Sequence, residues 1–323
     1  MTDQAARRCL LLFPKHFYSF ARFIAGGLER LGYEVVTAND EYPENMFGRI
    51  LGKLGLHAPL ASMTDRVLAR RFLAGRPFDL VLIVKGRGIG HRLIERMRRS
   101  GARVVAYNFD SFGYHPAPLR WFRDVDRFAT FDYADAQRHG LPRVDLFSSL
   151  PESGQPKEFR YDVSAILRNH SQRLQYVDSV LRALAPERAF VYVFEQNVFT
   201  FVLNVLRSPR LYARYWDRIS FTALPYAQYA EVLRGSDYTI DYAHPKQTGI
   251  TVRCFESLSA QTKVITNNPY VPRNPLFADA LPIVYRGRRD DDRLARQYAA
   301  GRGRVPARVH RSIEDFVAEL LGD

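Results

Sequence analysis

The sequence is poor in cysteine and has no long apolar run, and both shortages narrow the class of protein. Its two cysteines, Cys9 and Cys254, fall in a predicted strand and a predicted helix, which suits a reducing cytoplasm better than secretion. No apolar run approaches the roughly 20 residues that span a bilayer. The N-terminal apolar run stops at Pro14-Lys15 without a small-residue cleavage site, so we interpret it as a first strand.

Lysine is scarce, although the chain is strongly basic. Only 6 of the 47 basic residues are lysine, and the formal net charge is +13. A net positive charge of this size suggests nucleic acid, an anionic membrane or a polyanionic substrate as a partner. Codon bias across a genome also produces an excess of arginine over lysine, without any selection for binding. Residues 286–311 hold nine arginines and three aspartates. No nucleic-acid motif with interleaved aromatics accompanies them, so we expect no nucleic acid; a solvated basic face and a peripheral contact with an anionic membrane or glycan stay open.

Short apolar runs alternate with helix-length amphipathic segments along the chain. This alternation is typical of parallel strands joined by crossover helices. We predict strands at residues 8–14, 33–40, 78–86, 102–110, 161–168, 189–194, 238–243, 263–268 and 281–286. We predict helices at residues 16–32, 89–101, 171–185, 226–236, 251–261 and 312–322, and a helical excursion that ends near residue 76.

The chain is about twice the common domain size, which favours two domains. Residues 151–160 collect two prolines, one glycine and several charges, a composition typical of a linker. We therefore predict domains at residues 1–155 and 156–323, with the final helix able to pack back on the N-terminal domain. Two α/β units joined by a short linker imply a cleft, and ligands of open α/β sheets bind beyond the carboxyl ends of the strands.

Polar residues follow two predicted strands of the first half. Lys85 opens a Lys-Gly-Arg-Gly turn between strand and helix, which favours either an anion or a tight turn with solvated charges. Asp110 ends the next strand, where it would face the cleft and accept a proton, or cap the following turn. Asn108 and Tyr114 flank Asp110 and are candidate acceptor contacts. Farther on, Asp132 is better explained as a helix N-cap, and we assign no metal site.

The second half offers a stronger cluster between residues 241 and 256. A predicted strand delivers His244 to its end, and Gln247, Thr248 and Gly249 lead into a helix whose first amides would hold a phosphate. On that helix Arg253 and Glu256 lie three apart, and they form either an intrahelical ion pair or a pair of ligand contacts. Farther upstream, Arg168 stands between a strand and a helix, where anion binding and simple capping explain the sequence equally well.

Residues 244–268, HPKQTGITVRCFESLSAQTKVITNN, resemble the donor-binding segment of GT-B glycosyltransferases, particularly bacterial capsule, exopolysaccharide and lipopolysaccharide enzymes and their CgeB-like relatives. In that group a strand ends at a His-Pro pair, a glycine-containing turn opens a helix that carries Arg and Glu, and a short strand follows. Further segments resemble the same group in the same order: residues 82–89, 104–112, 128–140 and 161–173.

The resemblance implies an α/β GT-B fold, in which two Rossmann-like domains with parallel sheets face each other across a cleft. It implies that the second domain holds a nucleotide-diphosphate sugar and that the first presents a glycan or lipid-linked acceptor. Arg253 and the Thr248-Gly249 turn would take the diphosphate and Glu256 the ribose; we place Lys85, Arg168, His244 and Gln247 beside them as donor contacts. The sequence departs from the pattern in two places: Thr248 stands where many retaining members have a first Glu, and Gln261 where a Gly is common.

Our hypothesis is a cytoplasmic glycosyltransferase of bacterial surface polysaccharide synthesis that requires neither metal nor cofactor. Asp110 would deprotonate the acceptor hydroxyl in an inverting reaction and only orient substrate in a retaining one. Three alternatives stay open. The chain would be a catalytically silent nucleotide-sugar or carbohydrate-binding module, a GT-B sugar-nucleotide epimerase, or an RNA- or membrane-surface protein that uses its arginine-rich segment.

Overall fold

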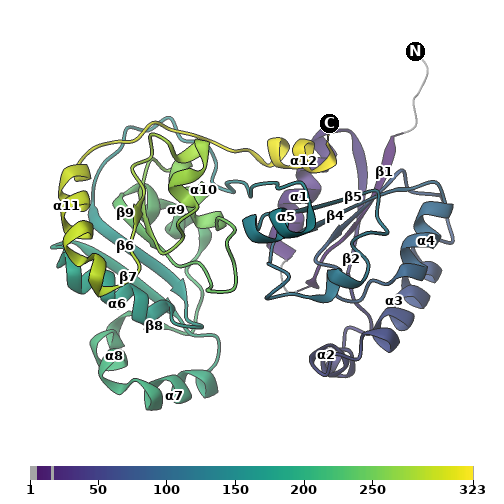
Figure 1. Ribbon diagram of the computed structural model, residues 1–323, viewed down its shortest axis with the longest axis horizontal. Helices are drawn as coiled ribbons and strands as arrows, with labels where there is room; N and C mark the ends of the chain where they lie inside the picture. The colour runs from purple at the N-terminus through teal and green to yellow at the C-terminus, as the bar shows by residue number, and fades with distance from the viewer. Residues whose placement is uncertain (1–5, 16–17, 323) are drawn as a thin grey trace. The chain divides into compact units, whose positions relative to one another are not determined.

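The structure is a computed structural model that describes residues 6–15 and 18–322 (Figure 1). The chain divides into two compact units. Unit 1 contains the residues up to Ser149, the loop Pro245–Gly249 and the C-terminal segment from Ser312; unit 2 contains Leu150–His244 and Ile250–Arg311. The sequence placed one boundary after residue 155, whereas the structure divides at Ser149 and returns two later segments to unit 1.

Unit 1 is built on a parallel sheet with the strand order β2-β1-β3-β4-β5. Its strands are β1 (Arg7–Leu12), β2 (Tyr33–Ala38), β3 (Leu80–Val84), β4 (Arg103–Asn108) and β5 (Arg127–Thr130). Every residue of β3 is buried, as its uninterrupted apolar sequence predicts for a strand covered on both faces. Strand β1 pairs with β2 on one side and with β3 on the other, so the direction of winding reverses between β1 and β3.

The helices of unit 1 fall in the predicted amphipathic segments. They are α1 (Tyr18–Arg30), α2 (Met46–Lys53), α3 (His57–Arg71), α4 (His91–Arg99), α5 (Tyr133–His139) and α12 (Ile313–Leu321). We predicted the first helix from residue 16, but residues 16 and 17 lie outside the described residues. Asp132 caps α5 by accepting the backbone N–H of Asp135 at 3.1 Å, as predicted.

The last helix, α12, packs inside unit 1 although it ends the chain. The guanidinium of Arg127, in β5, donates to the carbonyl oxygens of Leu320 at 2.9 Å and Glu319 at 3.0 Å. These carbonyls belong to the last turn of α12, where a helix leaves its acceptors unpaired and a cation is favourable. The ring of Phe316 lies edge-on to Tyr107 of β4, with ring centroids 5.1 Å apart.

Unit 2 contains a second parallel sheet, with the strand order β11-β10-β9-β6-β7-β8. Its strands are β6 (Tyr161–Arg168), β7 (Ala189–Phe194), β8 (Ile219–Ser220), β9 (Ser236–Asp241), β10 (Lys263–Thr266) and β11 (Ile283–Val284). Two successive crossovers run outward from β6 to β7 and β8, and the chain then returns to place β9 on the other side of β6. The winding therefore reverses between β6 and β9.

The helices of unit 2 cover both faces of this sheet: α9 and α10 lie on one side, and α6 with α11 lies on the other (Figure 1). The bounds are α6 (Arg173–Leu184), α7 (Val198–Arg207), α8 (Pro209–Arg214), α9 (Tyr226–Arg234), α10 (Val252–Ser259) and α11 (Asp291–Gly301). No element was predicted for residues 195–225, where the structure has α7, α8 and β8. In the described part of the chain, no helix is long and apolar enough to cross a membrane.

Candidate functional site

A cavity of about 340 Å³ opens at the carboxyl edge of the unit 1 sheet. Its lining residues follow four strands, because Pro14 comes after β1, Asn39–Glu41 after β2, Lys85 and Arg87 after β3, and His115 after β4. The cavity thus lies where β1 and β3 are neighbours and the winding reverses, which is where open α/β sheets bind ligands. Lys15, Pro43 and Glu44 complete the lining.

Asp40 is a buried acidic group of this cavity. Its Oδ2 accepts a hydrogen bond from the backbone N–H of Arg87 at 3.0 Å. Burial, and then the neighbouring Glu41 carboxylate, raises the pKa of Asp40 to about 7. A carboxyl group with this pKa gains or loses its proton near neutral pH, so it can act as an acid or a base toward a ligand in the cavity.

Two cations that line the cavity, Lys85 and Arg87, are each paired with a carboxylate. The Arg87 guanidinium makes two hydrogen bonds to the Glu41 carboxylate, and Nζ of Lys85 lies 2.5 Å from Oδ2 of Asp110. Burial, and then the Lys85 cation, lowers the pKa of His115 to about 4, so this imidazole is neutral at pH 7. Within the described residues its Nε2 has no hydrogen-bond partner. Such a lining suits an uncharged ligand rich in hydroxyl groups.

The glycines that follow Lys85 pack against the chain itself. A Cβ atom on Gly86 would lie 2.5 Å from the Trp121 ring, and one on Gly88 would lie 2.6 Å from Oγ1 of Thr64. These contacts leave no room beside the backbone at either glycine. The alternative of a tight turn therefore describes this segment better than the close approach of a ligand.

Asp110, the predicted catalytic base, has two partners in unit 1. Lys85 binds its Oδ2, and Nε2 of Gln247 donates to its Oδ1 at 2.7 Å. The carboxylate is well oriented but occupied, and its role as a base stays a prediction. Asn108 is fully buried and accepts the N–H of Asp110 at 3.3 Å, so the predicted direct contact between Asn108 and an acceptor is excluded in this conformation. Tyr114 is exposed.

The predicted phosphate-binding turn already holds an anion, the carboxylate of Asp132. Its Oδ2 accepts the backbone N–H groups of Thr248 at 2.6 Å and Gly249 at 3.3 Å, and its Oδ1 accepts the Thr248 hydroxyl at 2.8 Å. The amides attract an anion, as the sequence predicted, but it comes from the same chain. The expectation that Thr248 and Gly249 bind a diphosphate is therefore corrected, because a phosphate would have to displace Asp132.

Helix α10 begins at Val252 with Thr251 as its N-cap, which agrees with the helix predicted at residues 251–261. The Thr248-Gly249 turn therefore precedes the helix and is not its first turn. The Thr251 hydroxyl donates to Oδ1 of Asp241 at 2.7 Å, and the Thr266 hydroxyl donates to Oδ2 at 3.1 Å. The buried Asp241 thus fastens the ends of β9 and β10 to the entry of α10, which is a structural role.

Arg253 and Glu256, both on α10, meet the same tyrosine. The guanidinium carbon of Arg253 lies 5.7 Å from the centroid of the Tyr229 ring, a cation–π distance. The Tyr229 hydroxyl donates to Oε2 of Glu256, and the Tyr226 hydroxyl donates to Oε1 at 3.3 Å. Glu256 is buried, whereas Arg253 is half-buried. The hydroxyl donors show that this carboxylate is arranged to accept O–H groups.

Two further predicted donor contacts lie near the end of β6. Arg168 is exposed, and its guanidinium donates to the side chain of Gln196. His170 follows it, and burial, then the Arg173 and Arg168 cations, lowers its pKa to about 4. His244, at the end of β9, contributes to the same shift. The Arg168 and Arg173 cations make the carboxyl edge of the unit 2 sheet electropositive, which favours an anionic ligand.

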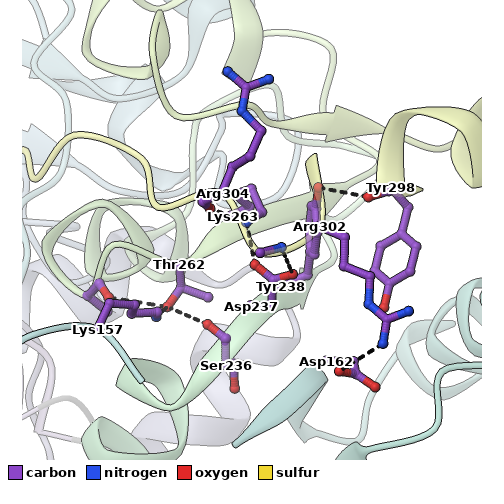
Figure 2. A network of polar contacts seen from close by, with 12 residues as sticks. Lys157, Asp162, Ser236, Asp237, Tyr238, Thr262, Lys263, Tyr298, Arg302 and Arg304 are labelled. Atoms are coloured by element: carbon purple, nitrogen blue, oxygen red, sulfur yellow. Dashed lines mark hydrogen bonds and ion pairs between the residues drawn. The ribbon is translucent and has the colours of Figure 1, made fainter. Parts of the chain in front are cut away.

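The opposite, amino edge of the unit 2 sheet carries a structural network (Figure 2). Lys263 is fully buried, forms an ion pair with Asp237, and donates to the carbonyl oxygen of Arg304 at 2.5 Å. Nearby, Nζ of Lys157 donates to the Thr262 hydroxyl at 2.7 Å, and Arg302 lies 3.5 Å from Asp162. Part of the arginine-rich segment is therefore held inside unit 2 by its own side chains and backbone.

Sequence reasoning missed Asp40, Glu41 and His115. The available signal was the Asn-Asp-Glu run at residues 39–41, at the end of the predicted strand 33–40, since strand ends are where sites are sought. Their gathering around Arg87 depends on contacts between different strands. Among the described residues, no group of three or more His, Cys, Asp or Glu side chains is arranged to hold a metal ion.

No family model matches the chain, and no curated protein matches it in sequence. Solved structures do resemble it. AviGT4, a glycosyltransferase involved in avilamycin A biosynthesis, has a TM-score of 0.57 at 11% identity, over 98% of this chain and 99% of that one. The UDP-GlcNAc 2-epimerase of Methanocaldococcus jannaschii in complex with UDP-GlcNAc and UDP has a TM-score of 0.54 at 10% identity, with the same coverage. Anabaena Alr3699/HepE in complex with UDP has a TM-score of 0.54 at 12% identity, again with the same coverage.

At such low identity these likenesses concern the fold alone. They extend over nearly the whole length of each chain, and they agree with the two parallel sheets and flanking helices described above. The fold predicted from the sequence is therefore confirmed: the chain has the α/β GT-B fold.

Proposed function

We propose that the chain is a GT-B enzyme that uses a nucleoside-diphosphate sugar, and that it transfers the sugar to a glycan or lipid-linked acceptor in bacterial surface polysaccharide synthesis. Structures of the same fold support the first part, because one is a glycosyltransferase and others hold UDP or UDP-GlcNAc. The proposed acceptor and pathway come from the sequence resemblance described above.

The observation that carries the proposal is the Arg253–Tyr229–Glu256 group of unit 2. Glu256 is a buried carboxylate that already accepts O–H donors, as it would from the two hydroxyls of a ribose. Arg253 is a cation on the first turn of the same helix, where the N-terminal dipole also favours negative charge. In this proposal Arg253, with Arg168, neutralises the diphosphate as it leaves, which lowers the barrier to transfer.

Unit 1 supplies the acceptor side in this proposal. Its cavity offers hydrogen-bonding groups for sugar hydroxyls. Two aspartates follow strands of unit 1: Asp40 after β2, in the lining of the cavity, and Asp110 after β4, bound to the lining residue Lys85. Asp110 remains the predicted base. Asp40 is a second candidate, because its pKa of about 7 lets it take a proton from a hydroxyl and release it again near neutral pH.

Epimerisation of the nucleotide sugar is a second candidate function. Two observations favour it: the fold is shared with a UDP-GlcNAc 2-epimerase, and Asp40 is poised to exchange a proton with a ligand. Such a reaction needs no acceptor. The two candidates therefore share a donor site and differ in whether the sugar leaves the nucleotide.

Thermal-shift and calorimetric titrations with UDP, GDP, dTDP and CMP, each free and sugar-linked, test the donor site. We expect one nucleotide to stabilise the protein and Arg253→Ala to weaken its binding by about tenfold or more, which corresponds to about 1.4 kcal/mol. Arg296→Ala, at an exposed arginine of α11, is the matched control and leaves binding unchanged. Absence of binding by every nucleotide would remove the proposal.

Incubation of the preferred nucleotide sugar without an acceptor separates the two reactions. A transferase is expected to leave the sugar stereochemistry intact and to release sugar slowly to water, which NMR detects as free monosaccharide. An epimerase gives a second nucleotide sugar instead. Binding without either reaction, with acceptor extracts included, would favour a silent binding module.

A further inference from the structure

Helix α7 carries an apolar face that nothing in unit 2 covers. None of its residues is buried, and its most exposed apolar side chains are Phe199, with 75% of its surface accessible, and Leu206, with 73%. Val198 and Val202 precede Leu206 at intervals of four, and Leu203 follows Phe199 at the same interval. The two rows are neighbours on the helix surface and form one exposed stripe. The whole set is Val198, Phe199, Val202, Leu203 and Leu206.

A separate flank of α7 attaches the helix to unit 2. Phe201 packs against Tyr212, Trp216 and Phe221, with ring centroids between 5.3 and 5.7 Å apart. Trp216 and Phe221 are themselves exposed. Figure 1 shows α7 and α8 beyond strand β8, at the end of unit 2 and outside its core.

Cations border this stripe. Residues 198–218 contain four arginines and one aspartate, and all four arginines are exposed. Arg214 forms an ion pair with Asp178, so the cations that we assign to this surface are Arg207, Arg210 and Arg218. Arg207 is the last residue of α7, and Arg210 and Arg214 lie on α8. Apolar and aromatic side chains on one face, with arginines at its border, are the features of a helix that lies in a membrane interface.

We propose that α7 and the start of α8 bind an anionic membrane surface, with the stripe inserted among the acyl chains and with Arg207, Arg210 and Arg218 against lipid phosphates. The exposed arginines beside the stripe favour an anionic membrane surface over other binding partners. A second copy of the chain, related by a two-fold axis, would bring the same arginine-bordered patch against itself, so like charges would meet. The inference stands apart from the proposed function, because it needs no nucleotide and no catalysis.

The proposal also assigns the membrane contact to a different segment from the one that the sequence indicated. The sequence pointed to residues 286–311, but the structure ties parts of that segment to unit 2 through Arg302, the carbonyl of Arg304, and Arg308, which donates to Gln261 at 2.8 Å. That segment exposes one large apolar side chain, Val305. Helix α7 exposes five large apolar side chains on one face.

Vesicle binding by the full chain tests the proposal. We expect sedimentation with phosphatidylcholine vesicles that contain about 30% phosphatidylglycerol, little with phosphatidylcholine alone, and weakening by salt. The double variant Phe199→Glu/Leu206→Glu is expected to lose about tenfold or more in affinity. Leu119→Glu/Val305→Glu is the matched control, because it adds the same charge at two other exposed apolar positions and is expected to lose less than about twofold.

Trp216 gives a test that needs no variant. The chain has two tryptophans, and Trp121 is buried whereas Trp216 is exposed beside the stripe. Vesicles with brominated acyl chains are expected to quench Trp216 and shift its emission to the blue. Three results would overturn the proposal: no binding to anionic vesicles, equal loss in both double variants, or an unquenched Trp216 with a concentration-dependent dimer that Phe199→Glu/Leu206→Glu dissociates.

Discussion

The carboxylate of Asp132 accepts both the backbone N–H and the hydroxyl of Thr248, at 2.6 Å and 2.8 Å. Asp132 is almost completely buried and also caps α5, so one side chain organises two segments of unit 1 that lie far apart in the sequence. The loop Pro245–Gly249 belongs to unit 1 for this reason, although the residues on either side of it belong to unit 2.

Replacing this carboxylate should loosen the loop. Asp132→Asn keeps the size of the side chain but places an amide N–H₂ against N–H and O–H donors. We expect a loss of about 1.5–3 kcal/mol of stability, the usual worth of hydrogen bonds to a charged group, and faster proteolysis within residues 245–249. Thermal unfolding and limited proteolysis measure the two effects. Asp279→Asn, at an exposed aspartate, is the control, and equal behaviour of the two variants would show that the Asp132 bonds contribute nothing.

Gly249 is needed for the contact between this loop and Phe131. A Cβ atom at position 249 would lie 2.2 Å from the Phe131 ring, far inside van der Waals contact. Gly249→Ala should therefore destabilise the protein by about 1–3 kcal/mol. Gly75→Ala meets no atom within 4 Å and should be nearly neutral. In a double-mutant cycle Phe131→Leu should recover part of the loss; if the two effects simply add, the clash is not the cause.

The Asp132–Thr248 pair also marks the limit of what could be predicted from the sequence. The Thr-Gly turn after a strand was a sound reason to expect an anion on its amides, and an anion is there. Which anion it is depends on a contact across 116 residues, and no local pattern records that contact.

Local sequence patterns predicted correctly those strands and helices whose burial follows directly from their apolar residues. Continuous apolar β3 and amphipathic α4 were predictable, and so was the alternation that gives each unit a parallel sheet. Helix α7 was missed although its polar residues Thr200, Asn204 and Arg207 recur at helical spacing, so its period was available in the sequence. The shifted pKa of Asp40 was not predictable, because it depends on burial and on Glu41 and Arg87 being brought together by the fold.

A comparison of two variants separates the structural role of Glu256 from its proposed role in binding. Glu256→Gln keeps the shape of the side chain but removes the charge, and we expect it to weaken nucleotide binding by about tenfold, or about 1.4 kcal/mol. Tyr229→Phe removes a donor to Glu256 without touching the carboxylate, so stability should fall by about 1 kcal/mol while nucleotide binding persists. Calorimetric titration and thermal unfolding of both variants measure the two quantities. Equal loss of binding in both would mean that Glu256 acts only through its tyrosines.

The last prediction concerns pH and the cavity of unit 1. The pKa of Asp40 is raised from its ordinary 3.8 to about 7. Between these values the folded protein holds a proton that the unfolded chain has released, so this group stabilises the fold below pH 3.8, and that stabilisation is lost as the pH rises through 7. The slope is at most about 1.4 kcal/mol per pH unit.

Asp40→Asn should remove this dependence, because the amide cannot ionise and its oxygen still accepts the N–H of Arg87. Relative to the unsubstituted chain, the variant should gain stability progressively from about pH 5 to about pH 7 and level off above that range. Thermal unfolding midpoints of the two proteins across this range measure the difference, with Asp279→Asn as an exposed control. A difference that does not change with pH would mean that Asp40 is ionised throughout, and it would remove Asp40 as a candidate acid or base.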